Sequence, residues 1–209
     1  MDPTISPAKH FRRVQNELLE EFPSMARYGT YAVARLVGPL VQAIQIRRSS
    51  GGYYCLEWYY TSVWADEERP CFMLLTSEME GLKLQSVLPR SHEKFFPRWV
   101  NTLRNEFLQE PIEGDILFSD FATHVEPTID RVNRNVCSMM IMLTKYYNRL
   151  DLAQKYESRL RESHRAEGIE LFDLDILAVE STPEYLQASY DEIVQRKHFV
   201  KLPRSKFIF

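Results

Sequence analysis

The chain has few cysteines, few glycines and no long apolar run. Cys55, Cys71 and Cys137 are odd in number and lack metal-ligand spacing, so a disulfide framework is not expected. No apolar run approaches the roughly 18 residues of a membrane span. No apolar signal core follows the charges near the start. We therefore expect a cytoplasmic protein without a membrane segment.

Catalytic motifs are also missing from the sequence. It contains no G-x-S-x-G, P-loop, G-x-G-x-x-G, H-E-x-x-H or C-x-x-C. The five histidines are scattered, and none shows the spacing of metal ligands. A Cys–His pair could still be assembled from distant positions, but nothing singles one out. We expect a protein that is not an enzyme and that needs no cofactor and no metal.

The sequence also lacks an excess of positive charge. The 209 residues carry a formal net charge of −3, and the pI is about 6.0. Binding to nucleic acid or to an anionic membrane surface is therefore not expected. An apolar share of 44% and an aromatic share of 12% are enough for a packed core in one large domain or two small ones.

The first half of the chain changes from a helical period to a strand period. Residues 7–22 place apolar side chains at helical spacing, and a proline follows. Strands are then predicted over residues 28–36, 39–48, 53–64 and 71–76, and a helix over 91–109. This pattern predicts an N-terminal helix and an antiparallel sheet of about four strands that contains a hairpin over residues 40–64.

The faces of that hairpin predict its loop length. Ile44 and Ile46 share a face with the even-numbered aromatic residues of the second strand. A three-residue loop, 49–51, places Ile46 opposite Tyr54 and keeps the apolar faces together, whereas an even-length loop separates them. The even face is expected to be buried. The odd face, with Tyr53, Glu57 and Tyr59, is half polar and is a candidate binding surface.

The second half of the chain is mainly helical. A continuous apolar stripe runs from about residue 125 to 147, and residues 137–143 predict a central helix. Further helices are predicted over 152–166 and from 181 to about 197, with a strand over 169–179 between them. The fold class is therefore α+β. We expect a single domain, 1–209, that could subdivide into a sheet-containing part, 1–114, and a mainly helical part, 115–209.

Charge is distributed unevenly along this second half. Residues 166–195 contain no Lys or Arg and carry −8, so the rest of the chain carries +5. The last fourteen residues are rich in Lys and Arg, which either neutralise this acidic segment or leave it as a binding face for a basic partner. The candidate partner-binding carboxylates are Glu170, Asp173, Asp175, Glu180 and Glu184.

The hairpin resembles that of a group of small bacterial α+β domains that are similar to toxin immunity proteins. The likeness covers roughly residues 8–110. The residues that carry it are Val41, Gln42, Ile44, Ser49, Ser50, Gly51, Gly52, Tyr53 and Tyr54. The resemblance implies a protein that inhibits by binding and has no catalytic residues. The long helical second half departs from that pattern.

Three functions remain open at this point. The first is a non-catalytic cytoplasmic immunity protein that occludes the active site of a basic toxin or effector domain. The second is a metal-dependent nuclease or hydrolase, because Asp173 and Asp175 on one face of a strand, with Glu170 nearby, could hold Mg²⁺. The third is a structural or assembly protein, for instance of a phage. A homodimer is also a possible assembly.

Overall fold

The structure, a computed structural model, describes residues 7–64, 86–108, 110–115, 134–196 and 198–208. These residues form two compact units. Unit 1 comprises residues 7–60, 86–108, 110–111 and 201–206. Unit 2 comprises residues 61–64, 112–115, 134–196, 198–200 and 207–208. The tail thus contributes residues to both units.

Unit 1 joins two helices to a four-stranded sheet with the order β1-β2-β3-β4, so the α+β class is confirmed. Its elements are α1 (Pro7–Glu21), β1 (Ala26–Tyr28), β2 (Ala32–Val37), β3 (Leu40–Arg48), β4 (Tyr54–Ser62) and α2 (His92–Thr102). The last residues of β4 fall in unit 2. A 3₁₀ turn, Pro89–Ser91, precedes α2, and a π-helical turn, Leu103–Phe107, follows it.

The predicted strand 28–36 is instead a short hairpin. Tyr28 pairs with Ala32, and Gly29 takes a positive φ of 60° between them. A glycine adopts this conformation without the steric cost that a Cβ would add. The predicted strand 71–76 and the first residues of the stripe that begins near 125 lie outside the described residues.

The β3–β4 hairpin has the odd-length loop that the sequence predicts, displaced by one residue. Ser49 donates its backbone N–H to the carbonyl oxygen of Tyr53 at 2.8 Å, so the loop is Ser50–Gly52. This shift moves the pairing by two residues along β4, and the even-numbered side chains still share a face. The contact between the side chains of Gln42 and Tyr60 agrees with the shifted pairing.

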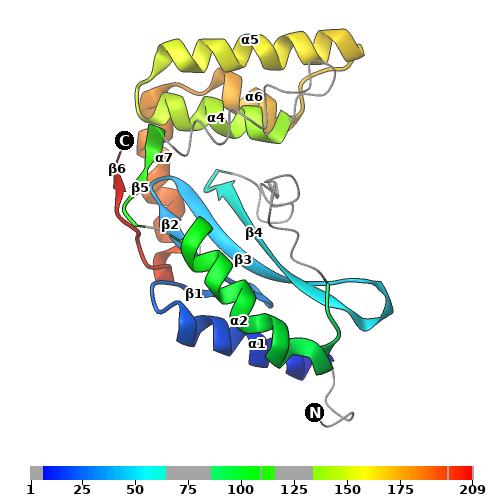
Figure 1. The fold of residues 1–209 in the computed structure, drawn as a ribbon. Helices are drawn as coiled ribbons and strands as arrows, with labels where there is room; N and C mark the ends of the chain where they lie inside the picture. The colour runs from blue at the N-terminus through cyan, green and yellow to red at the C-terminus, as the bar shows by residue number, and fades with distance from the viewer. Residues whose placement is uncertain (1–6, 65–85, 109, 116–133, 197, 209) are drawn as a thin grey trace. The chain divides into compact units, whose positions relative to one another are not determined.

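The even face of β4 is covered by α1 and α2, which lie on the same side of the sheet (Figure 1). Tyr54 packs its ring against Phe11 of α1 and against Trp99 of α2. Trp58 packs against Phe107, just beyond α2. The core of unit 1 therefore lies between this face and the two helices, as the aromatic pattern predicts.

The chain also places its tail beside β2. Leu36 donates its backbone N–H to the carbonyl oxygen of Pro203 and accepts from the backbone N–H of Ser205, both at 2.8 Å. This pairing continues along β2 beyond the last partner that β1 supplies. Residues 201–206 are therefore part of the fold of unit 1.

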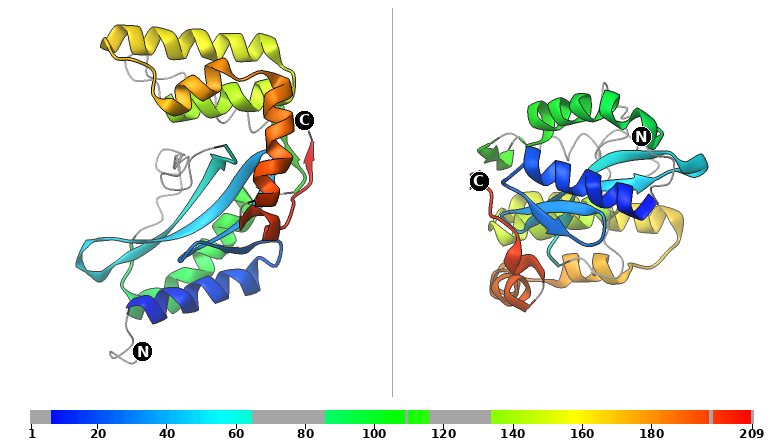
Figure 2. Two further views of the ribbon diagram at one scale, coloured as in Figure 1. Left: turned by 180° about the vertical axis from the view of Figure 1, so that it is seen from behind. Right: turned by 90° about the horizontal axis from the view of Figure 1, so that it is seen from below.

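Unit 2 is mainly helical. Its elements are β5 (Ile112–Glu113), α4 (Arg134–Tyr146), α5 (Leu150–Glu167), α6 (Asp173–Glu180), α7 (Pro183–Arg196) and β6 (Phe207–Ile208). A 3₁₀ turn, His198–Lys201, belongs to unit 2 except for its last residue, which falls in unit 1. Strands β5 and β6 pair in parallel. Helix α4 contacts α5, α6 and α7 (Figure 2). Residues 137–143 are all buried, so the predicted central helix is confirmed.

The predicted strand over 169–179 is wrong, because these residues form α6 and the turn before it. Gly168, in the left-handed conformation, ends α5, as its position in the sequence indicates. The alternation of Phe172, Leu174 and Ile176 fits a strand, but Asp175 accepts the backbone N–H of Phe172 at 3.3 Å and caps a helix instead. This correction changes which side chains share a face.

Candidate functional site

The acidic segment, residues 166–195, lies in unit 2 and spans the end of α5, all of α6 and most of α7. Of the five carboxylates proposed from the sequence, four are exposed: Glu170, Asp173, Glu180 and Glu184. The fifth, Asp175, is only 2% exposed. The segment is therefore mostly a solvated acidic surface, and Asp175 has a different role.

Asp175 connects the first turn of α6 to the neighbouring helices α4 and α5. One carboxylate oxygen accepts a hydrogen bond from Ser138 of α4 at 2.5 Å, and the other lies 2.9 Å from Nε2 of His164 of α5. His164 donates through Nδ1 to the backbone carbonyl of Glu170 at 2.8 Å. Both ring nitrogens of His164 therefore lie close to oxygen atoms, and the ring joins α5 to the turn before α6 and to its first turn. The expectation that Asp175 binds a partner is wrong, because its carboxylate is enclosed.

The other end of α6 is held by a buried lysine. Lys145 of α4 donates to the carbonyl oxygens of Ala178 and Val179 at 2.9 and 2.7 Å, and its Nζ lies 2.7 Å from a carboxylate oxygen of Glu157. A cation at the carboxyl end of a helix complements the helix dipole and satisfies its free carbonyls. Helix α6 is therefore fixed at both ends, and its outer face is a rigid platform.

An open depression of about 490 Å³ lies along this outer face. Side chains from α6, from the turn and from the first turn of α7 line it: Asp173, Ile176, Leu177, Glu180, Thr182 and Tyr185. We call it the α6–α7 depression. Ser181 also contributes, but its hydroxyl donates to the carbonyl of Leu177 at 2.5 Å and serves the turn itself. The depression combines carboxylates with apolar side chains.

The apolar side chains of this region are unusually exposed. Ile176 is 38% and Tyr185 is 53% exposed. Among the described residues, eight large apolar side chains are exposed, and four of these lie between positions 169 and 185: Ile169, Phe172, Ile176 and Tyr185. Such a concentration of apolar surface is typical of an interaction site. The sequence interpretation missed Ile176 and Tyr185, because it assigned a strand to the first and no role to the second.

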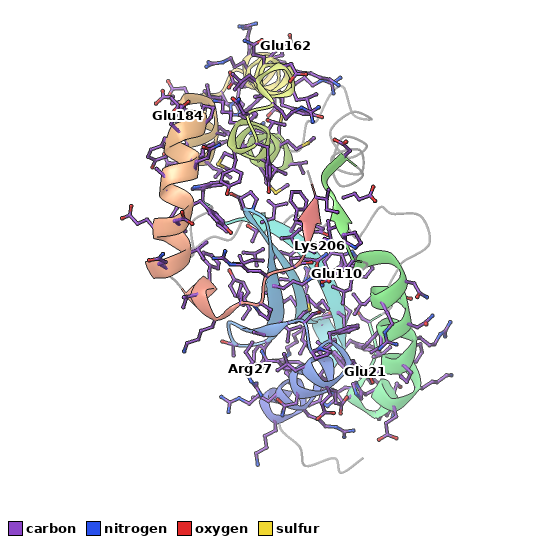
Figure 3. All side chains as sticks on the ribbon, turned by 90° about the vertical axis from the view of Figure 1, so that its left-hand side faces the viewer. Glu21, Arg27, Glu110, Glu162, Glu184 and Lys206 are labelled. Atoms are coloured by element: carbon purple, nitrogen blue, oxygen red, sulfur yellow. The ribbon has the colours of Figure 1, made fainter. Side chains whose placement is uncertain are left out.

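Two carboxylates line the depression, those of Asp173 and Glu180. Within the described part of the chain, the side chains of Asp173 and Glu180 make no hydrogen bond or ion pair. Glu184, on the first turn of α7, points away from its helix (Figure 3). Hydrogen bonds from its own backbone N–H and from the Thr182 hydroxyl lower the pKa of Glu184. The surface therefore presents negative charge that no described neighbour neutralises.

The three candidates from the hairpin belong to unit 1 and do not form one exposed surface. Tyr53 is 40% exposed, as a binding residue requires. Glu57 is half-buried and pairs with Arg47 at 2.8 Å. Tyr59 is only 3% exposed, and burial raises its pKa. The expectation that Tyr59 lies on a wetted face is therefore wrong, because both faces of β4 are covered at that position.

The metal hypothesis does not fit the geometry of α6. Asp173 and Asp175 are two positions apart on a helix, so they do not share a face as they would on a strand. Asp175 points inward to Ser138 and His164, whereas Asp173 lines the depression. Among the described residues, no group of three or more His, Cys, Asp or Glu side chains converges as metal ligands.

A buried polar cluster in unit 1 has the composition of a catalytic site but not the access. His92 of α2 contacts the Tyr54 hydroxyl through Nδ1 and the Glu17 carboxylate through Nε2, and Arg13 donates to Glu17 at 2.6 Å. Tyr54 is completely buried, and burial raises its pKa. Burial opposes the charged form of Glu17, but the hydrogen bonds from Arg13 and His92 outweigh it and lower the pKa of Glu17. The cluster therefore joins α1, α2 and β4.

A second buried polar group in unit 1 centres on Arg35 of β2. Its guanidinium donates through Nε to Gln42 at 2.5 Å and pairs through Nη1 with Glu110. Gln42 in turn donates to the Tyr60 hydroxyl and to the carbonyl of Phe107, at 2.5 and 2.8 Å. Burial lowers the pKa of Arg35. This network links β2, β3, β4 and the π-helical turn after α2.

Comparison with known proteins does not assign these features to a protein family. No protein-family model, curated protein or solved structure matches the chain. The resemblance of residues 8–110 to immunity-like domains therefore stays a prediction. In the part of the chain that the structure describes, no helix has both the length and the apolar character that crossing a membrane requires.

Proposed function

We propose that the chain is a non-catalytic binding protein whose α6–α7 depression receives a basic protein partner. The observation that carries this proposal is the combination of exposed Ile176 and Tyr185 with the unpaired carboxylates of Asp173 and Glu180. Aromatic and aliphatic anchors supply affinity in protein interfaces, and surrounding charges steer the partner and select its sign. The acidic surface repels nucleic acid and anionic lipid for the same reason.

In its most specific form, the proposal is a bacterial immunity protein that occludes the active site of a toxin in the cytoplasm. A toxin that cleaves nucleic acid needs a positively charged cleft, which the acidic surface of unit 2 complements. The resemblance of the hairpin supports the same class. Unit 1, with its enclosed polar clusters, would act as the scaffold.

A protection assay tests this function. The product of the neighbouring reading frame is expressed in a bacterial host, with or without the present chain, and colony-forming units are counted. We expect the chain to restore growth, and the double variant Asp173→Lys/Glu180→Lys to lose most of the protection. The control Glu113→Lys/Glu162→Lys makes the same charge change at exposed positions of unit 2 outside the depression.

Two results would count against the proposal. The immunity role fails if the wild-type chain gives no protection against a neighbouring product that is itself toxic. The role of the α6–α7 depression fails if the double variant protects as well as the wild type. Circular dichroism of each variant confirms that the comparison is between folded proteins.

A further inference from the structure

The lining residues of α6 follow one face of the helix. Asp173, Ile176, Leu177 and Glu180 occupy positions i, i+3, i+4 and i+7. A carboxylate therefore stands at each end of this face, with two aliphatic side chains between them. Because an α-helix rises 1.5 Å per residue, the two carboxylate positions are about 10 Å apart along the axis.

We propose that the α6–α7 depression binds a cationic amphipathic helix of the partner. This helix carries Lys or Arg at positions i and i+7 and apolar side chains at i+3 and i+4. The inference rests on the proposed function and names the partner element that the site selects. A helix laid along α6 repeats the spacing of α6, so its two cations meet Asp173 and Glu180 while its apolar residues pack on Ile176 and Leu177.

An extended segment does not match the same spacing. A strand rises about 3.3 Å per residue, so a span of about 10 Å corresponds to three residues. Side chains three residues apart on a strand point to opposite faces. Only one of two such cations could face α6. The separation of the two carboxylates along α6 therefore favours a helix over an extended peptide.

Ion pairs and apolar contacts are expected to contribute differently to the affinity of the partner helix. An exposed ion pair changes affinity by roughly fivefold at most, because water and salt screen it. Apolar contacts with Ile176, Leu177 and Tyr185 stabilise the complex in proportion to the exposed apolar area that they remove from water. The apolar residues therefore supply most of the affinity, and the carboxylates set the register and exclude acidic helices.

Synthetic peptides test the register directly. The first is a helical peptide of about 14 residues with Lys at i and i+7, Leu at i+3 and i+4, and Ala or Gln elsewhere. The second has the same composition, but its second Lys is moved to i+5, which turns it away from α6. Fluorescence anisotropy measures the binding of each labelled peptide to the full chain. We expect the first peptide to bind about three- to fivefold more tightly than the second, because the second loses one of the two ion pairs.

The same titration with variants completes the test. Asp173→Lys/Glu180→Lys should weaken the first peptide about tenfold and remove its advantage over the second, whereas Glu113→Lys/Glu162→Lys should leave both unchanged. Equal binding of the two peptides by the wild type, or equal weakening by the control, would overturn the helix proposal. If the growth assay still depends on Asp173 and Glu180 in that case, the proposed function stands without the helix.

Discussion

The polar clusters around Arg35 and His92 in unit 1 are largely buried and hydrogen-bonded, whereas Asp173 and Glu180 on the outer face of α6 in unit 2 are exposed and make no hydrogen bond or ion pair with the described residues. In unit 1, Arg35 donates a hydrogen bond to Gln42 within the core, and His92 joins Tyr54 to Glu17. Groups of this kind contribute to the fold that contains them and are not available to a ligand. The unpaired carboxylates beside exposed Ile176 and Tyr185 contribute nothing visible to their own fold, which is why we assign the binding role to α6 and α7.

The largest expected effect lies in the core of unit 1. Gln42→Leu removes the acceptor of the Arg35 Nε and the donor to the carbonyl of Phe107, so buried polar groups lose their partners. We expect the free energy of unfolding to fall by about 3–5 kcal/mol in a denaturant titration. Gln45→Leu, on the same strand at a half-buried position, should change it by less than about 0.5 kcal/mol. Similar losses for both variants would refute the internal role of Gln42.

Substitutions of the two aspartates of α6 should separate an effect on the stability of unit 2 from an effect on partner binding. Asp175→Ala leaves the buried Ser138 hydroxyl without its acceptor and removes the carboxylate 2.9 Å from Nε2 of the buried His164, and should cost about 2–4 kcal/mol. Hydrogen exchange of the α6 amides should rise accordingly. Asp173→Ala should change stability by less than about 0.5 kcal/mol and weaken partner binding instead. The comparison between inner and outer faces fails if Asp173 proves to be the more destabilising of the two.

A smaller effect is expected from pH in unit 1. Burial and the nearby positive charges of His92 and Arg13 lower the pKa of His10, whose Nε2 is enclosed without a partner among the described residues. The unfolded chain therefore binds a proton at a higher pH than the folded chain does. Stability contributed by neutral His10 is present above about pH 6.5 and is lost as the pH falls towards the lowered value, by at most about 1.4 kcal/mol per pH unit.

The variant His10→Phe isolates this contribution. Phenylalanine keeps a ring against Tyr54 and His92 but cannot bind the proton. Denaturant titrations between pH 7.5 and 5.5 should show a shallower loss of stability for the variant than for the wild type. Parallel curves would show that His10 does not bind its proton differently in the folded and unfolded chains.

The sequence predicts the fold well wherever a long periodic pattern is available. The apolar spacing of residues 7–22 gives α1, and the continuous stripe around residues 137–143 gives the buried α4. The hairpin pattern fixes which side chains share a face, because a shift by two residues keeps the parity that burial requires. The shift itself depends on the turn, and the four consecutive small residues Ser49–Gly52 offer a three-residue loop more than one position.

The candidate site is less predictable because burial depends on distant partners. Asp173 and Asp175 look equivalent in the sequence, and a strand would place them on one face. Asp175 is buried because Ser138 and His164, from two other helices, converge on it. No local pattern contains that information. The acidic character of residues 166–195 could be predicted, and the depression within it could not.

The affinity of the neighbouring gene product for the chain is the most direct test of the central claim. Isothermal titration at low and at physiological ionic strength would compare the wild type with Asp173→Lys/Glu180→Lys. Our account predicts that the double variant binds at least about tenfold more weakly and loses much of the salt dependence that the wild type shows. Equal affinities and equal salt dependence would show that the partner does not bind at the α6–α7 depression.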